Sequence, residues 1–172
     1  MKTIDAVANY VTLHRMFFAR AEEFGDAPMV MEGKSGEYKP ISWSSMAQAA
    51  REIASGLLSL GVAKGDRVAI MAYNRPQWLV ADMAIMAVGA ITIPIYHTSS
   101  EPTAARILEK SGTRVAFVAR SDKAEMLVSC SALLKTIISL DPIGVDEAGA
   151  CSMDYNTLKL HGIEHLQKCG RN

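Results

Sequence analysis

The segment from Gly65 to Ser100 limits the fold of this chain more than any other part of it. A short apolar run from Val68 to Met71 is followed by Pro76, a residue typical of the first turn of a helix. Gly89 ends that helix, and the β-branched run from Ile91 to Ile95 predicts the next strand. Strand, helix and strand in this order make a βαβ unit. Its strands are parallel and its crossover is right-handed in nearly all proteins.

The alternation of strand and helix continues on both sides of this unit. Before it, Ser42 caps a predicted helix that runs to about Leu60 and has one apolar face. After it, the sequence predicts a helix from Ser99 or Ser100 to Gly112, a strand from Arg114 to Val118, a helix from Ser121 and a strand from Thr136 to Leu140. We therefore expect an α/β fold, a three-layer and mostly parallel sheet with flanking helices.

The N-terminal part differs from this pattern. Thr12 to Glu23 has helical spacing, and Pro28 to Ser42 predicts a hairpin whose turn lies at Gly33 to Gly36. The Gly-Lys-Ser triplet in that turn is not a nucleotide-binding loop, because the upstream glycine of that motif is missing and no helix follows.

The C-terminal part lacks a clear period. Asp141 to Met153 contains Pro, Gly and acidic residues, so the sequence predicts a loop or linker there. Tyr155 to Lys168 predicts a last helix, weakened by Gly162, and we expect no strand after that helix.

The charge distribution argues against a nucleic-acid partner. The 172 residues include 18 Lys and Arg and 18 Asp and Glu, for a formal net charge of zero. The two signs are interspersed, so no basic stripe is present. Trp78 to Ile95 is apolar enough to suggest a membrane span, but Asp82 lies inside it and Gly89 divides it. A buried helix followed by a buried parallel strand explains this run better.

Cysteine and histidine residues raise two questions, a disulfide framework and a metal site, and the sequence favours neither. Cys130, Cys151 and Cys169 are widely spaced, which favours a reducing compartment over a disulfide framework. His161, His165 and Cys169 are spaced four apart, as metal ligands on one helical face can be. Because a fourth ligand and a catalytic carboxylate are missing nearby, we prefer a polar edge that faces solvent, and we expect no metal site.

The loops at the carboxyl ends of the strands are the candidate ligand sites, because parallel α/β sheets bind ligands there. The first of these loops is Ala72 to Arg75, and the second, Tyr96 to Ser100, carries Tyr96, His97, Thr98 and Ser99. Hydroxyl and backbone N–H groups at a helix N-terminus suit an anionic ligand, although Ser99 or Ser100 can simply cap the helix. His97 is either a base or ligand contact, or a loop histidine bonded to backbone.

A third loop, Ala119 to Lys123, carries two cations. Arg120 and Lys123 at a helix start would bind phosphate, or they are solvated surface charges. The role of Asp82 inside an apolar helix stays open. The G-x-G-x-x-G and G-x-S-x-G motifs are absent from the sequence, so the residues alone predict a scaffold with three ligand loops and no catalytic residue.

The order and spacing of several short motifs resemble the N-terminal subdomain of AMP-forming acyl-CoA synthetases. These motifs are Leu60-Gly61-Val62, Gly65 to Ala69, Asn74 to Trp78, Gly89-Ala90 and Pro94 to Ser100. The last of them is similar to the long-chain fatty acid branch of that family. The resemblance implies one partial domain, with residues 12–140 as the N-terminal subdomain and residues 141–172 as a linker and terminal helix.

The resemblance also implies an activity for the full-length enzyme. A long-chain fatty acid–CoA ligase uses ATP with Mg²⁺ to convert a fatty acid to an acyl adenylate, and CoA then takes the acyl group. The phosphate loop, adenine-binding residues and catalytic lysine of the family lie further along the chain than Asn172. We therefore expect a fragment that is inactive alone and holds no cofactor tightly.

The family likeness gives the candidate loops a ligand. In related synthetases the CoA nucleotide lies against loops equivalent to these, which implies that Arg120 and Lys123 meet a CoA phosphate. Tyr96, His97, Thr98 and Ser99 would line its approach.

Two alternative functions are another adenylate-forming enzyme, such as a peptide-synthetase adenylation domain or a luciferase-like enzyme, and a stand-alone α/β binding module. We expect a cytoplasmic location, with peripheral membrane contact left open, and a homodimer or poor solubility from exposed apolar surface.

Overall fold

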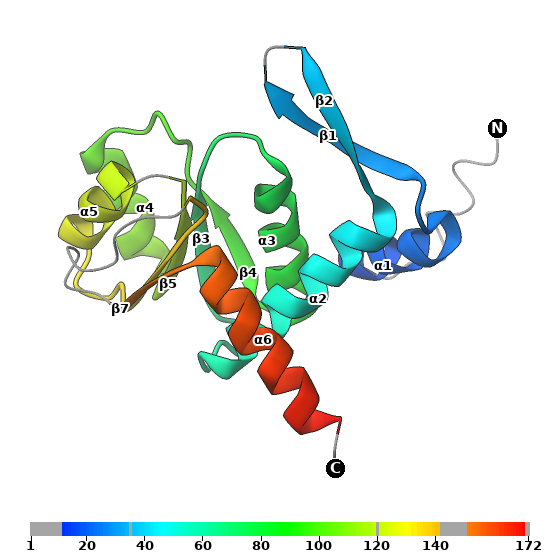
Figure 1. Ribbon diagram of the computed structural model, residues 1–172. Helices are drawn as coiled ribbons and strands as arrows, with labels where there is room; N and C mark the ends of the chain where they lie inside the picture. The colour runs from blue at the N-terminus through cyan, green and yellow to red at the C-terminus, as the bar shows by residue number, and fades with distance from the viewer. Residues whose placement is uncertain (1–11, 35, 120, 142–150, 171–172) are drawn as a thin grey trace.

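Residues 12–34, 36–119, 121–141 and 151–170 are described by the computed structural model (Figure 1). Five strands form one parallel sheet in the order β4-β3-β5-β6-β7. Their bounds are β3 (Arg67–Met71), β4 (Ile91–Pro94), β5 (Val115–Val118), β6 (Thr136–Ser139) and β7 (Cys151–Asp154). The parallel strands between residues 67 and 118 confirm the predicted βαβ unit.

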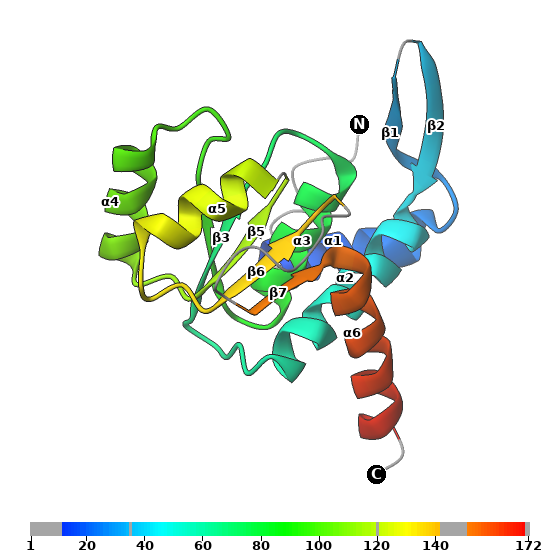
Figure 2. The same ribbon diagram turned by 60° about the vertical axis from the view of Figure 1, so that its left-hand side comes forward.

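Helices cover both faces of this sheet (Figures 1 and 2). One hydrophobic cluster contains residues of four helices, and a second cluster on the other face contains residues of two. The first four are α1 (Leu13–Phe24), α2 (Trp43–Ser59), α3 (Pro76–Ala87) and α6 (Tyr155–Cys169), and the other two are α4 (Glu101–Ser111) and α5 (Ser121–Cys130). The three-layer α/β fold predicted from the sequence is therefore confirmed.

Strand β3 shows why its sequence is continuously apolar. Val68 and Ile70 belong to the first cluster, whereas Ala69 and Met71 belong to the second, and all four are fully buried. Successive side chains of a strand point to opposite faces, so a strand between two helical layers needs apolar residues at every position.

Local signals set the helix ends as predicted. Ser42 caps α2, because its Oγ accepts a hydrogen bond from the backbone N–H of Ser45 at 3.2 Å. Gly89, with φ of +77°, follows the end of α3 in a conformation that favours glycine. Ser100, and not Ser99, is the N-cap of α4, and its Oγ lies 3.1 Å from Oγ1 of Thr103.

The predicted loop from Asp141 to Met153 is wrong at its end. Residues Cys151–Asp154 form β7, which pairs in parallel with β6. Thr136 lies opposite Cys151 at one end of this ladder, and Ser139 lies opposite Asp154 at the other. Met153 is buried in the first cluster, and its burial together with the ladder to β6 stabilises a strand of only four residues.

Strands β1 (Pro28–Lys34) and β2 (Glu37–Ser42) form the predicted antiparallel hairpin, which projects from the body (Figure 1). Its turn contains Gly36 with φ of +89°, which agrees with a turn and not with a phosphate loop. The apolar run from Trp78 to Ile95 is divided between α3 and β4. Among the described residues, the helices are all too short or too polar to cross a membrane.

Candidate functional site

The carboxyl ends of β3, β4, β5 and β6 meet at one edge of the sheet, because these strands are parallel neighbours. The loops that follow them therefore lie together, as the sequence predicts, and we call this region the carboxyl edge. Helix α3 leaves it toward one face and α4 leaves it toward the other. Connections that diverge in this way open the crevice where α/β proteins bind ligands.

The loop after β4 is open to solvent. Tyr96 is 83% exposed, His97 and Thr98 are exposed, and Ser99 is half-buried. The backbone N–H of Ser99 donates to the carbonyl oxygen of Tyr96 at 2.8 Å, so the loop turns tightly before α4 begins. Its polar side chains are thus accessible to a ligand at the N-terminus of a helix.

The ring of His97 contacts the loop after β3. Its centroid lies 6.3 Å from the ring centroid of Tyr73, with an angle of 84° between the planes. This edge-to-face geometry is a favourable arrangement of two aromatic rings. It joins the two loops that flank the first βαβ crossover.

Arg75 connects the loop after β3 with the loop after β6. Its Nη1 donates to Oδ1 of Asp141 at 2.7 Å and to the hydroxyl oxygen of Tyr73 at 3.3 Å, and its Nε donates to Oε1 of Gln77 at 2.9 Å. The guanidinium carbon also lies 5.4 Å from the Tyr73 ring centroid. The Arg75 side chain is 15% exposed and the Asp141 side chain is 37% exposed, so the guanidinium is mostly shielded from water and the carboxylate is partly open to it.

Sequence reasoning missed the pair between Arg75 and Asp141. The two residues are 66 positions apart, and each follows a predicted strand. The sequence did show that each residue stands at the end of a predicted strand. It did not show that the two strand ends are close, because that requires the order of the strands, in which only β5 separates β3 from β6.

The loop after β5 is described in part. Arg120 lies outside the described residues, so its predicted place at the anion site is not tested by the structure. Lys123 is half-buried in the first turn of α5, which begins at the carboxyl edge. Asp122 precedes it in the same turn, and Glu101 lies in the first turn of α4. These acidic residues already compensate part of the positive ends of both helices.

A cleft of about 530 Å³ lies between the hairpin and the carboxyl edge. Its lining includes Met31 and Tyr38 of the hairpin and Tyr73, Arg75 and Asp141 of the edge. Met31 and Tyr38 are both more than half exposed. The cleft therefore combines apolar contact area with one ion pair.

Asp82 is away from the carboxyl edge and has a structural partner. Its Oδ1 accepts a hydrogen bond from Oγ1 of Thr92 at 2.6 Å, which ties α3 to β4. Burial raises the pKa of the Asp82 carboxyl, and the hydrogen bond from Thr92 acts in the opposite direction. This contact answers the question that the sequence left open.

The histidines of α6 form contacts with α2 and with solvent. Nδ1 of His165 lies 2.9 Å from Oγ of Ser55, and Sγ of Cys169 lies 3.9 Å from Nε2 of His165. His161 and Cys169 are exposed, in agreement with a polar edge, whereas His165 is half-buried against α2. Within the described ranges, groups of three or more His, Cys, Asp or Glu side chains able to hold a metal ion are absent.

One known protein family matches most of this chain. Residues 17–158 match the family described as AMP-binding enzyme. Fatty acyl-CoA synthetase A of Dictyostelium discoideum is 30% identical over 146 residues, which are 85% of this chain and 22% of that protein. Long-chain-fatty-acid–CoA ligase FadD15 of Mycobacterium tuberculosis is 33% identical over 125 residues, which are 73% of this chain and 21% of that protein. The chain thus spans about a fifth of the length of these relatives.

Solved structures of adenylation domains share the fold. The A domain of carboxylic acid reductase from Segniliparus rugosus, a complex with AMP and a carboxylic acid, has a TM-score of 0.77 and 17% identity, and the match covers 92% of this chain and 31% of that chain. Acetoacetyl-CoA synthetase from Streptomyces lividans has a TM-score of 0.77 and 21% identity, and the match covers 85% of this chain and 24% of that chain. These likenesses confirm the predicted fold class.

Proposed function

This chain belongs to the family of AMP-binding enzymes, and from that membership we propose that it is the N-terminal part of an ATP-dependent long-chain fatty acid–CoA ligase. The match to fatty acyl-CoA synthetase A over 85% of the chain carries the proposal. The family resemblance noted in the sequence is confirmed by the match to residues 17–158.

The proposed reaction of the whole enzyme has two steps. The fatty acid carboxylate attacks the α-phosphorus of ATP, so that an acyl adenylate forms and pyrophosphate leaves. The CoA thiol then loses its proton to solvent, its sulfur attacks the acyl carbonyl carbon to form a thioester, and AMP leaves with the electrons of the broken C–O bond. Fatty acid, ATP and CoA are thus the proposed small-molecule partners.

The 172 residues do not fit a complete ATP and Mg²⁺ site. The family's Ser/Thr/Gly-rich phosphate loop has no counterpart in this sequence. The described side chains also provide no cluster of three acidic, histidine or cysteine ligands. We therefore propose that the 172-residue chain alone forms neither acyl adenylate nor acyl-CoA. The cytoplasmic location, the peripheral membrane contact and the homodimer stay predictions.

The carboxyl edge is the proposed approach for CoA. Tyr96, His97, Thr98 and Ser99 supply exposed aromatic, imidazole and hydroxyl groups at the start of α4. Lys123 supplies positive charge at the start of α5, and Arg120, outside the described residues, is proposed to add a second cation. The cations are needed because acidic residues already occupy both first turns.

The test is done on the protein encoded by the complete reading frame. Lys123→Ala and Arg120→Ala are each expected to raise the KM for CoA about tenfold, since each removes a charged contact to phosphate. Fatty-acid-dependent exchange of pyrophosphate into ATP, which needs no CoA, stays at the wild-type rate. Lys135→Ala is the control, because Lys135 is exposed next to the amino end of β6. An unchanged KM in both variants would exclude this binding site.

The fold likeness to carboxylic acid reductase leaves a second candidate, an adenylating enzyme for another acid. Pyrophosphate exchange measured with fatty, aryl and amino acids separates the two. Exchange with long-chain fatty acids supports the ligase, and exchange that requires an amino or aryl acid replaces it. A complete reading frame without a phosphate loop would favour the stand-alone binding module.

A further inference from the structure

We propose that Arg75 is a positioning residue for CoA: it holds Tyr73, and through the Tyr73 ring it holds His97 and the loop from Tyr96 to Ser99 in place. The inference rests on the proposed function, because it assigns that loop to the CoA side. It goes further by naming a residue outside the loop that sets the loop's geometry.

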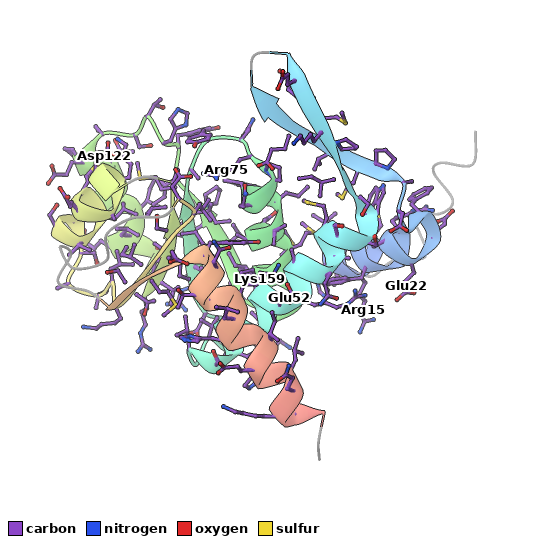
Figure 3. The ribbon with its side chains drawn as sticks, in the orientation of Figure 1. Arg15, Glu22, Glu52, Arg75, Asp122 and Lys159 are labelled. Carbon is purple, nitrogen blue, oxygen red and sulfur yellow. The ribbon has the colours of Figure 1, made fainter. Side chains whose placement is uncertain are left out.

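Arg75 is itself fixed from several directions. Its side chain is labelled in Figure 3, in the loop that leads into α3. Pro76 follows Arg75 and restricts it to extended backbone, and Arg75 has φ of −159° and ψ of 160° as the N-cap of α3. Its guanidinium donates to Asp141 at 2.7 Å and to Gln77 at 2.9 Å. A planar group with two such anchors is held in one orientation, because rotation would break both bonds.

The fixed guanidinium determines where the Tyr73 ring lies. The ring is 42% exposed, so packing alone does not hold it. Arg75 contacts it twice, through the 3.3 Å hydrogen bond to the hydroxyl oxygen and through the guanidinium carbon 5.4 Å from the ring centroid. Both contacts favour one ring position.

The Tyr73 ring then supports His97. The two rings meet edge to face, with centroids 6.3 Å apart. His97 is exposed, and the described contacts of its ring include this one to Tyr73. A chain of contacts therefore runs from Asp141 after β6, through Arg75 and Tyr73 after β3, to His97 after β4.

The opposite end of β3 offers a matched control. Arg67 is also half-buried and anchored by two hydrogen bonds, from Nε to the carbonyl oxygen of Ser111 at 2.6 Å and from Nη1 to that of Gly65 at 3.1 Å. It lies at the amino end of the strand, away from the proposed CoA loop. The variant Arg67→Ala therefore shows what the loss of an arginine held by two hydrogen bonds does to the enzyme in general.

The experiment compares two half-reactions in the complete enzyme. Fatty-acid-dependent pyrophosphate exchange reports the adenylate step without CoA, and acyl-CoA formation gives the KM for CoA. Arg75→Ala is expected to raise that KM about tenfold and to leave the exchange rate within about twofold of wild type, since a misplaced contact loop weakens only the step that uses it. Arg75→Lys keeps the charge and recovers part of the loss.

Tyr73→Leu removes the ring contacts and leaves the ion pair between Arg75 and Asp141, so it avoids the larger structural change. We expect it to raise the KM for CoA as well, whereas Arg67→Ala leaves it unchanged. An unchanged KM in Tyr73→Leu, or equal losses in both half-reactions for Arg75→Ala and Arg67→Ala, would overturn the positioning role. A wild-type enzyme that shows no fatty-acid-dependent exchange would instead overturn the proposed function itself.

Discussion

Gly162 of α6 lies directly against the backbone of Glu52 of α2. A Cβ atom at position 162 would stand 1.8 Å from the carbonyl oxygen of Glu52. One turn earlier on α6, the carbonyl oxygen of Leu158 would be 2.5 Å from a Cβ at Gly56. Two glycines, one on each helix, therefore allow α2 and α6 to approach closely. In the sequence, Gly162 only predicted a weaker helix.

Gly162→Ala should destabilise the chain. Overpacking of a close contact costs about 1–3 kcal/mol, and the better helix propensity of alanine returns at most about 1 kcal/mol. The measurement is the midpoint of urea unfolding at an unchanged m-value. Gly170→Ala is the control, because the nearest atom to a Cβ there is 3.4 Å away, and it should change stability by less than about 0.5 kcal/mol. Equal midpoints for the two variants would contradict the close contact.

Lys159→Met should destabilise the chain by leaving Glu52 without its cation (Figure 3). Nζ of Lys159 lies 3.1 Å from Oε2 of Glu52, and the Glu52 side chain is 9% exposed. Breaking a fully buried pair costs about 3–5 kcal/mol, and Lys159 is 39% exposed, so we expect about 1–2 kcal/mol here.

Adding Glu52→Gln to Lys159→Met should recover part of this loss, because the buried charge disappears and Gln48 still has an oxygen to donate to. A double-mutant cycle of urea unfolding measures the coupling. Additive effects of the two substitutions would show that the pair contributes nothing.

Asp82→Asn should flatten the dependence of stability on pH. Burial raises the pKa of the Asp82 carboxyl in the folded chain. Between the ordinary pKa of about 4 and the raised value, the folded state binds more protons than the unfolded state, so the wild type loses stability as pH rises through that window. Asparagine keeps an oxygen that accepts from Thr92 and does not titrate.

The difference in unfolding free energy between Asp82→Asn and wild type should therefore grow in favour of the variant as pH rises through this window. Urea unfolding across the window measures it. Asp26→Asn is the control, because Asp26 is exposed and also accepts from a hydroxyl, Oγ of Ser44, at 2.7 Å. A difference that is the same at every pH would refute the expectation.

Asp154→Ala should shorten or destabilise α6. Oδ1 of Asp154 accepts from the backbone N–H of Thr157 at 2.7 Å, and loss of such a cap costs about 1 kcal/mol. Asp154→Asn keeps the acceptor and should stay close to wild type. Thermal unfolding followed by circular dichroism provides the comparison. An alanine variant as stable as wild type would mean that β7 and α2 hold α6 without the cap.

The site was predicted less completely than the fold. The loop from Tyr96 to Ser99 could be placed because any residue just after a parallel strand lies at the carboxyl edge. Contacts between side chains could not be predicted. Arg75 reaches Asp141 across β5, and the direction of the Arg75 side chain depends on the order and register of three strands. The phosphate contact of Arg120 stays a prediction, because this residue lies outside the described residues.

The sequence by itself determined most elements and their order, because each has a local cause. Ser42 caps α2, Pro76 begins α3 and Gly112 ends α4 in a left-handed conformation, and these signals act within a few residues. Tertiary structure alone decided that Cys151–Asp154 is a strand and that Gly162 is a contact. The sequence Cys-Ser-Met-Asp lacks the β-branched and aromatic residues that mark the other four-residue strands of the sheet. A glycine shows its packing role only when a second backbone lies against it.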